Sequence, residues 1–236
     1  MDEGKYQYDL IVIGSGPGGQ KAAIQAAKLG KKVAVVEANP LIGGVCLHDG
    51  TIPSKSFREA ILHLSGYRER SHYGKAYRVK QRVCMEDLVS RADGIAVDIE
   101  QTIRSQLLRN SAEIIEGFGA IEDEHHVRVK NASNELLLST EYIVISTGTR
   151  PCHPPGFECD EDVILDSDGI LHIDRLPRSL TIVGGGVIGS EYGSMFSALG
   201  IKVTIVEARD EILGFVDREL IDTLTYILRS QKATII

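Results

Sequence analysis

The sequence contains one segment twice, and this repeat constrains the fold more than any other feature. Residues 9–38, DLIVIGSGPGGQKAAIQAAKLGKKVAVVEA, align without a gap with residues 179–208, SLTIVGGGVIGSEYGSMFSALGIKVTIVEA, at an offset of 170 positions. Each copy predicts a buried strand, a glycine turn, a helix and a second buried strand. Such a βαβ unit pairs its strands in parallel and is right-handed. We therefore predict an α/β protein with two Rossmann-like dinucleotide-binding units and three-layer, doubly wound sheets.

The spacing of the glycines predicts what the two units bind. The glycines are Gly14, Gly16, Gly19, Gly184, Gly186 and Gly189. In each copy the first makes the tight turn, the second lets a pyrophosphate approach the backbone, and the third lets the helix pack on the strand. The pyrophosphate then lies at the helix N-terminus, where N–H groups and the helix dipole favour negative charge. A carboxylate that closes the second strand, Glu37 or Glu207, can accept hydrogen bonds from ribose hydroxyls.

Composition narrows the class of protein. The 236 residues, 43% of them apolar, suffice for two modest domains with their own cores. A net charge of -7 argues against a general nucleic-acid binder, and no run of about 18 apolar residues predicts a membrane span. The start, MDEGKYQYDLIVIG, carries acids and leads directly into a strand, so we expect neither a signal nor a transit peptide. We predict a cytoplasmic protein.

Four scattered cysteines, without a Cys-x-x-Cys pair, predict neither a disulfide framework nor a metal site. They are Cys46, Cys84, Cys152 and Cys159.

The segment between the two copies predicts two helices and several short strands. Ser54–Gly66 is expected to form a helix after a turn at Pro53, and Met85–Arg109 a longer one with a core-facing apolar stripe. The strand candidates are AEIIEGFGAI, HHVRVK, NELLLS and YIVIS. The proline-rich segment CHPPGFECD follows and predicts a boundary between domains at residues 1–150 and 151–236.

A third motif, GGVCLHDGTIPSK at Gly43 to Lys55, lies between the glycine loops. With both glycine fingerprints and TGTRP at 147–151 in this order, the chain resembles the two-dinucleotide flavoprotein disulfide reductases over essentially all 236 residues. In that family the first fingerprint holds FAD and the second holds NAD(H) or NADP(H). The resemblance therefore implies an FAD-binding domain within residues 1–150 and the start of an NAD(P)-binding domain within residues 151–236.

The family continues beyond the point where this chain stops, at KATII, in what looks like a buried strand. We therefore expect the chain to be the N-terminal part of a longer protein, without the C-terminal dimerisation domain. By the same resemblance the complete protein is expected to be a homodimer or a higher oligomer.

The resemblance also points to one branch of the family. Members with an active disulfide carry a second cysteine five residues after the first, whereas here Cys46 is followed by Thr51. Because a dithiol–disulfide couple needs two sulfurs within bonding reach, FAD is not expected to pass electrons to a disulfide. The variant GTIPSK is similar to that of soluble, Si-specific NAD(P)+ transhydrogenases. This implies FAD-dependent hydride transfer between NADPH and NAD+.

Two charged residues are the catalytic candidates that the resemblance implies. Lys55 would lie beside the flavin N5 edge, and Glu191 would pair with it where the nicotinamide stacks. A cation there would stabilise negative charge on the reduced flavin. Val187 stands where some relatives place an aromatic gate, which is compatible with easy nucleotide exchange. The other residues expected at the cofactors are Gly18, Gly43, Gly44, Cys46, Gly119, Thr147, Gly148, Ile188 and Arg209.

The second fingerprint raises a question of specificity. Glu207 should favour the 2′-hydroxyl of NAD and repel the 2′-phosphate of NADP, whereas Arg209 could stack on adenine or meet that phosphate. We expect NAD(H) to bind more tightly than NADP(H). Two other functions stay open: a disulfide-less NADH oxidase or diaphorase, and a non-catalytic nucleotide-binding fragment.

Overall fold

The computed structural model describes residues 5–74, 76–153, 155–160 and 162–236. These residues fall into two compact units, the first within Met1–Pro53 and Asp93–Glu158 and the second within Ser54–Ala92 and Cys159–Ile236. The predicted domain limits, 1–150 and 151–236, stay a prediction. The first four residues of the predicted N-terminal segment and Pro154 of the predicted connector lie outside the described residues.

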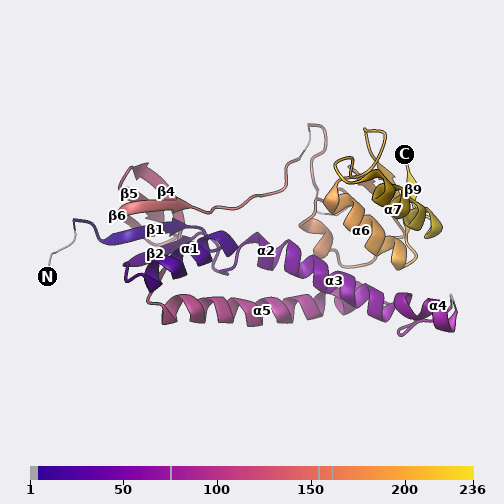
Figure 1. The fold of residues 1–236 in the computed structure, drawn as a ribbon, viewed down its shortest axis with the longest axis horizontal. Coiled ribbons are helices and arrows are strands. Elements are labelled where there is room, and N and C mark those ends of the chain that lie inside the picture. The colour runs from indigo at the N-terminus through magenta and orange to yellow at the C-terminus, as the bar shows by residue number, and fades with distance from the viewer. Residues whose placement is uncertain (1–4, 75, 154, 161) are drawn as a thin grey trace. The chain divides into compact units, whose positions relative to one another are not determined.

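A six-stranded sheet forms the centre of the first unit (Figure 1). Its order is β3-β2-β1-β6-β5-β4. The strands are β1 (Tyr8–Ile13), β2 (Val33–Glu37), β3 (Glu113–Glu116), β4 (Phe118–Asp123), β5 (His126–Lys130) and β6 (Glu135–Ile145). Strands β3, β2, β1 and the end of β6 pair in parallel, whereas β4, β5 and the start of β6 pair antiparallel.

Strand β6 differs from the prediction, which divided it into NELLLS and YIVIS. It is one strand whose first part pairs with β5, from Glu135 to Ser139, and whose second part pairs with β1, from Thr140 to Ile145. The apolar pattern breaks where the strand changes its neighbour, so a single strand gives the pattern of two. Conversely, AEIIEGFGAI is divided into β3 and β4 at Gly117, whose φ is +149°.

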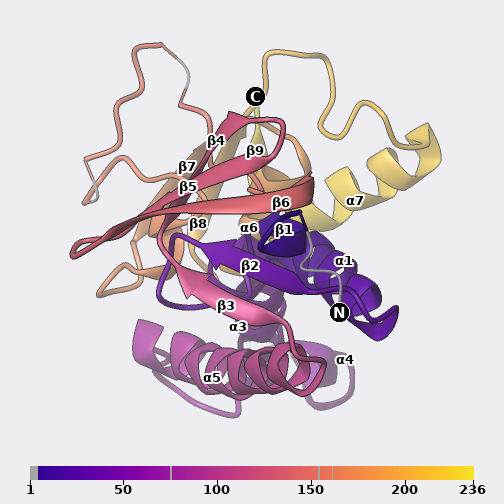
Figure 2. The same ribbon diagram turned by 90° about the vertical axis from the view of Figure 1, so that its left-hand side faces the viewer.

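The sheet of the first unit is covered differently on its two faces. Helix α1 (Pro17–Lys28) and the end of α5 (Met85–Arg109) pack on one face, where Val12, Val35 and Leu107 belong to one apolar cluster. On the other face Ile11, Ile13, Ala34 and Val36 join residues of β5 and β6, including Val127 and Leu138. Alternate residues of β1 and β2 thus point to opposite faces, as the pleat of a strand requires. Figure 2 shows β6, β5 and β4 continuing the sheet from β1.

The second unit holds a three-stranded parallel sheet in the order β7-β8-β9. Its elements include α3 (Thr51–Leu64, which starts in the first unit), β7 (Ser179–Val183), α6 (Val187–Ala198), β8 (Lys202–Val206), α7 (Arg218–Ser230) and β9 (Thr234–Ile235). The core of this unit contains residues that are far apart in the chain. The rings of Phe57 and Phe196, for example, are both fully buried and their centroids lie 5.8 Å apart. The mixed α/β fold with parallel, Rossmann-like βαβ units is confirmed.

Helix boundaries agree with the sequence in some places and differ in others. Helix α5 has the predicted bounds, whereas α3 begins at Thr51 rather than at Ser54. Pro53 therefore lies in the first turn of α3, where its missing N–H costs nothing. The remaining short helices are α2 (Val45–His48), η1 (Tyr67–Glu69), α4 (Arg70–Tyr73) and η2 (Gly169–Leu171). Among the described residues, every helix is either too short or too polar to cross a membrane.

Candidate dinucleotide-binding sites

The glycines of the first fingerprint have different structural roles. Gly14 has φ +104°, and a Cβ there would lie 2.2 Å from the carbonyl oxygen of Ser146. A Cβ on Gly19 would lie 2.0 Å from the carbonyl oxygen of Gly14. By contrast, Gly16 is the N-cap of α1, with φ −64°, and a Cβ there would have no heavy atom within 4 Å. Gly14 and Gly19 are thus required by the fold, whereas Gly16 leaves open space in front of the helix N-terminus.

Ser15 joins the loop to the acidic residue, a role that the sequence analysis missed. Its Oγ and its backbone N–H both donate to Oε2 of Glu37, at 2.6 and 2.8 Å. The same Oγ accepts a hydrogen bond from the N–H of Gly43 at 2.9 Å. Ser15 is fully buried, so these three hydrogen bonds to two residues fix the loop. The sequence feature that could have indicated this role is the hydroxyl residue inside the first fingerprint, because the second copy has a glycine, Gly185, at the same position.

The Gly43–Gly44 pair packs directly on the glycine loop. Both have positive φ, +123° and +67°. A Cβ on Gly44 would lie 2.9 Å from Cα of Gly16, so side chains would push the two segments apart. This close approach explains why the GGVC segment begins with two glycines.

These segments line a cavity of about 700 Å³ in the first unit. This volume is within the range of small-molecule and cofactor sites, about 300–1,000 Å³. The predicted residues that line it are Gly14, Gly16, Gly18, Glu37, Gly44, Cys46, Gly119, Thr147 and Gly148. Open space at Gly16, a helix N-terminus and a carboxylate in one cavity fit the pyrophosphate and ribose of FAD.

Cys46 and Thr51 line the same cavity. Cys46 is half-buried in α2 and forms no disulfide within the described part of the chain. Thr51 begins α3, so the position that the family resemblance assigns to a second sulfur holds a hydroxyl at the wall of the cavity.

The second fingerprint repeats this geometry within the second unit. Gly184 has φ +107°, a Cβ on Gly189 would lie 2.1 Å from the carbonyl oxygen of Gly184, and Gly186 is the N-cap of α6 with no heavy atom within 4 Å of a Cβ. Val187 and Ile188 start α6 and are more than half exposed. The second loop therefore also presents an open helix N-terminus.

Glu207 directly follows β8 and is held by four hydrogen bonds. Its Oε2 accepts from the N–H of Gly185 at 2.7 Å and from Nη2 of Arg209 at 3.2 Å. Its Oε1 accepts from the backbone N–H and from Nε of Arg209, at 3.0 and 2.9 Å. Chiefly because of the Arg209 side chain, then the backbone N–H groups, the pKa of Glu207 is lowered to about 2. The carboxylate is therefore ionised at neutral pH.

The structure brings together the two predicted catalytic residues. Nζ of Lys55 in α3 forms an ion pair with Oε1 of Glu191 in α6, and both residues belong to the second unit. The Lys55 side chain is 59% exposed and that of Glu191 22%. Their catalytic roles stay a prediction.

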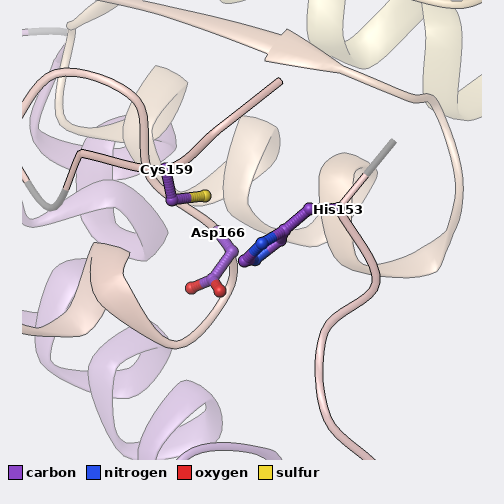
Figure 3. A group of neighbouring side chains, drawn as sticks. All are labelled: His153, Cys159 and Asp166. Atoms are coloured by element: carbon purple, nitrogen blue, oxygen red, sulfur yellow. The ribbon is translucent and has the colours of Figure 1, made fainter. Parts of the chain in front are cut away.

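Two further polar residues of the second unit lie near each other. Cys159 Sγ and a carboxylate oxygen of Asp166 are within 4.8 Å (Figure 3). His153, drawn in the same figure, belongs to the first unit. Two ligand atoms are fewer than the three or four protein ligands of a zinc site, so this pair by itself does not define one.

Comparison with known proteins places this geometry in a family. The family model of pyridine nucleotide-disulphide oxidoreductases matches residues 8–236. The chain belongs to this family. A soluble pyridine nucleotide transhydrogenase of Mycobacterium bovis (strain BCG / Pasteur 1173P2) is 50% identical over 230 residues, which are 97% of this chain and 49% of the relative. That of Photobacterium profundum is 42% identical over 233 residues.

Two solved structures share the fold of this chain. LpdA from Mycobacterium tuberculosis matches with a TM-score of 0.86 and 26% identity, over 96% of this chain and 50% of that one. The HOCl-induced flavoprotein disulfide reductase RclA from Escherichia coli matches with a TM-score of 0.80 and 31% identity, over 97% and 48%. The chain thus spans about half the length of the relatives that it matches.

Proposed function

We propose that this chain supplies the FAD-binding and nicotinamide-nucleotide-binding parts of a pyridine nucleotide transhydrogenase that transfers hydride between NADPH and NAD+. The observation that carries the proposal is Thr51, which lines this cavity at the position where the family resemblance places the second cysteine of a disulfide reductase. The 50% identity to transhydrogenases over nearly the whole chain supports the same activity.

The residues of the first unit bind and orient FAD. The N-terminus of α1 at Gly16 faces the pyrophosphate, because its backbone N–H groups and dipole favour anions. Glu37, fixed by Ser15, accepts hydrogen bonds from the adenosine ribose. When bound, FAD supplies the two-electron chemistry that carries hydride from one nicotinamide nucleotide to the other.

The residues of the second unit bind NAD(H) and NADP(H) in turn. Gly186 and the N-terminus of α6 receive the pyrophosphate, and Glu207 with Arg209 meets the adenosine ribose. We further propose that Lys55, oriented by Glu191, stabilises negative charge on the reduced cofactor.

The test starts from the visible spectrum of the protein purified with added FAD. A stoichiometric flavin band, followed by NADPH-dependent reduction of thio-NAD+ without oxygen uptake, is the expected result. Gly16→Ala is the matched negative variant, because its Cβ meets no protein atom but enters the space of the pyrophosphate. Oxygen consumption in place of thio-NAD+ reduction would support an oxidase or diaphorase instead. Nucleotide binding without turnover would support a non-catalytic module.

We also propose a cytoplasmic location and, for the complete protein, a homodimer or a higher oligomer. The location follows from the sequence composition and the oligomer from the family resemblance. Sedimentation of the full-length protein measures the second point, and a monomer at all concentrations would contradict it.

A further inference from the structure

The hydrogen-bond capacity of Glu207 is already used by this protein's own residues. A carboxylate offers about four lone-pair positions. In Glu207 the backbone N–H groups of Gly185 and Arg209 take two, and the guanidinium of Arg209 takes the other two through Nε and Nη2. The Glu207 side chain is 8% exposed, whereas that of Arg209 is 62% exposed. The exposed guanidinium therefore occupies acceptor positions that a ribose hydroxyl would need.

The first copy of the repeat provides an internal comparison. Glu37 accepts two hydrogen bonds from Ser15 and one from the backbone N–H of Asn39. Asn39 is the counterpart of Arg209 at the offset of 170 positions, but its side chain accepts from the N–H of Leu41. Within the described residues Glu37 thus keeps one acceptor position that no protein group uses. The two copies differ where an adenosine ribose binds.

We propose that Arg209 is the specificity-determining residue that lets the second fingerprint accept both NAD(H) and NADP(H). This inference rests on the proposed function and names the residue that makes dual use of one site possible. A glutamate is ionised at neutral pH, so Glu207 without a cation beside it would repel a 2′-phosphate, as acidic residues at this position do in NAD-selective sites. Arg209 offsets that repulsion.

The guanidinium acts differently with each nucleotide. With NADP(H) it stays beside Glu207 and donates to the 2′-phosphate, because its planar fork matches phosphate oxygens. With NAD(H) the ribose hydroxyls replace the guanidinium at Glu207. The guanidinium can leave because the Arg209 side chain is 62% exposed and is solvated by water there, while the ribose hydroxyls take its place as donors to Glu207. Gly185 and the Arg209 backbone continue to hold the carboxylate in both cases.

The experiment compares equilibrium dissociation constants of NAD+ and NADP+ by calorimetry. In Arg209→Asn, which installs the residue of the first copy, the Kd of NADP+ is expected to rise by on the order of tenfold to hundredfold. The Kd of NAD+ is expected to change less than about threefold, since its contact is with Glu207. Arg209→Lys keeps the charge but loses the fork, so an intermediate Kd for NADP+ is expected.

Arg229→Asn is the matched control. It removes the same charge in the same unit, but Arg229 lies in the last turn of α7, which leads into the start of β9, whereas Glu207 follows the end of the parallel strand β8. The Kd values of Arg229→Asn for NAD+ and NADP+ should equal those of the unmodified protein. Urea unfolding of each variant verifies that the exposed substitutions leave the fold intact.

Salt provides a second readout. The Kd of NADP+ in the unmodified protein should rise with ionic strength more steeply than that of NAD+, and Arg209→Asn should remove the difference. Equal effects of Arg209→Asn on both nucleotides, or no effect on NADP+, would overturn this inference and leave the proposed function standing. Failure of the unmodified protein to bind either nucleotide would overturn the proposed function itself.

Discussion

Ser15 and Glu37 are joined by two hydrogen bonds that end on the same carboxylate oxygen. Because Ser15 Oγ also receives the N–H of Gly43, this one hydroxyl connects the glycine loop, the end of β2 and the GGVC segment. The three elements that surround the open space at Gly16 are thus fixed by one buried side chain. Ser15 thus preorganises the cavity that we propose binds FAD.

Ser15→Ala should therefore weaken both the fold and the binding of FAD. The substitution removes the hydroxyl bond to Glu37 and leaves the N–H of Gly43 without its acceptor. Losing a buried partner costs about 1–3 kcal/mol, so the free energy of unfolding in urea should fall by about that amount. Ser133→Ala, at an exposed serine of the same unit, should change it by less than about 0.5 kcal/mol. Equal effects of the two variants would contradict this role of Ser15.

Replacing the second glycine of each fingerprint by alanine should abolish the binding of a different ligand. Gly16→Ala and Gly186→Ala each add a Cβ that meets no protein atom within 4 Å. Both variants should fold. Gly16→Ala should lose the flavin band and retain NAD+ binding, whereas Gly186→Ala should lose NAD+ binding and retain the flavin band. Visible absorption and NAD+ calorimetry on both proteins measure this.

Gly14→Ala separates ligand effects from folding effects. Its Cβ would lie 2.2 Å from the Ser146 carbonyl oxygen, and φ is +104°, so the loop itself must distort. We expect a lower free energy of unfolding in urea for Gly14→Ala than for Gly16→Ala. If Gly16→Ala were the less stable of the two, the assignment of open space to Gly16 would be wrong.

The parts of the fold that the sequence predicts are those encoded by local patterns. Both βαβ units and helix α5 follow from apolar periodicity and glycine spacing. The continuity of β6 does not, because its change of partner depends on strands distant in the chain. Ser15 was missed for a similar reason, since its bonds reach residues 22 and 28 positions away. The pairing of Lys55 with Glu191, 136 positions apart, was predicted only through the family resemblance.

Stability should decline at high pH through Tyr8. Its hydroxyl donates to Oε2 of Glu113 at 2.7 Å, linking the start of β1 to β3. Burial, and then this contact, raise the pKa of Tyr8 from 10.0 to about 12. The folded state therefore holds a proton that the unfolded state releases between pH 10 and 12. This contribution is fully present below pH 10 and is lost as pH rises toward 12.

Urea unfolding between pH 9 and about 12 measures that decline. In Tyr8→Phe the free energy of unfolding should decline less over this pH range, because the titrating hydroxyl is gone. Tyr142→Phe, at an exposed tyrosine of the same unit, should leave it unchanged. A Tyr8→Phe protein that loses stability over this range as steeply as the unmodified protein would show that other groups cause the decline.

The ion pair of Lys55 with Glu191 should contribute to activity rather than to stability. Because the Lys55 side chain is 59% exposed, Lys55→Gln should change the free energy of unfolding by less than about 1 kcal/mol. The proposed role at the reduced cofactor predicts a fall on the order of a hundredfold in NADPH-dependent thio-NAD+ reduction. The exposed pair of Arg68 with Glu59 in the same unit is the matched control, so Arg68→Gln should leave turnover unchanged. Equal losses of turnover in both variants would remove Lys55 from the catalytic machinery.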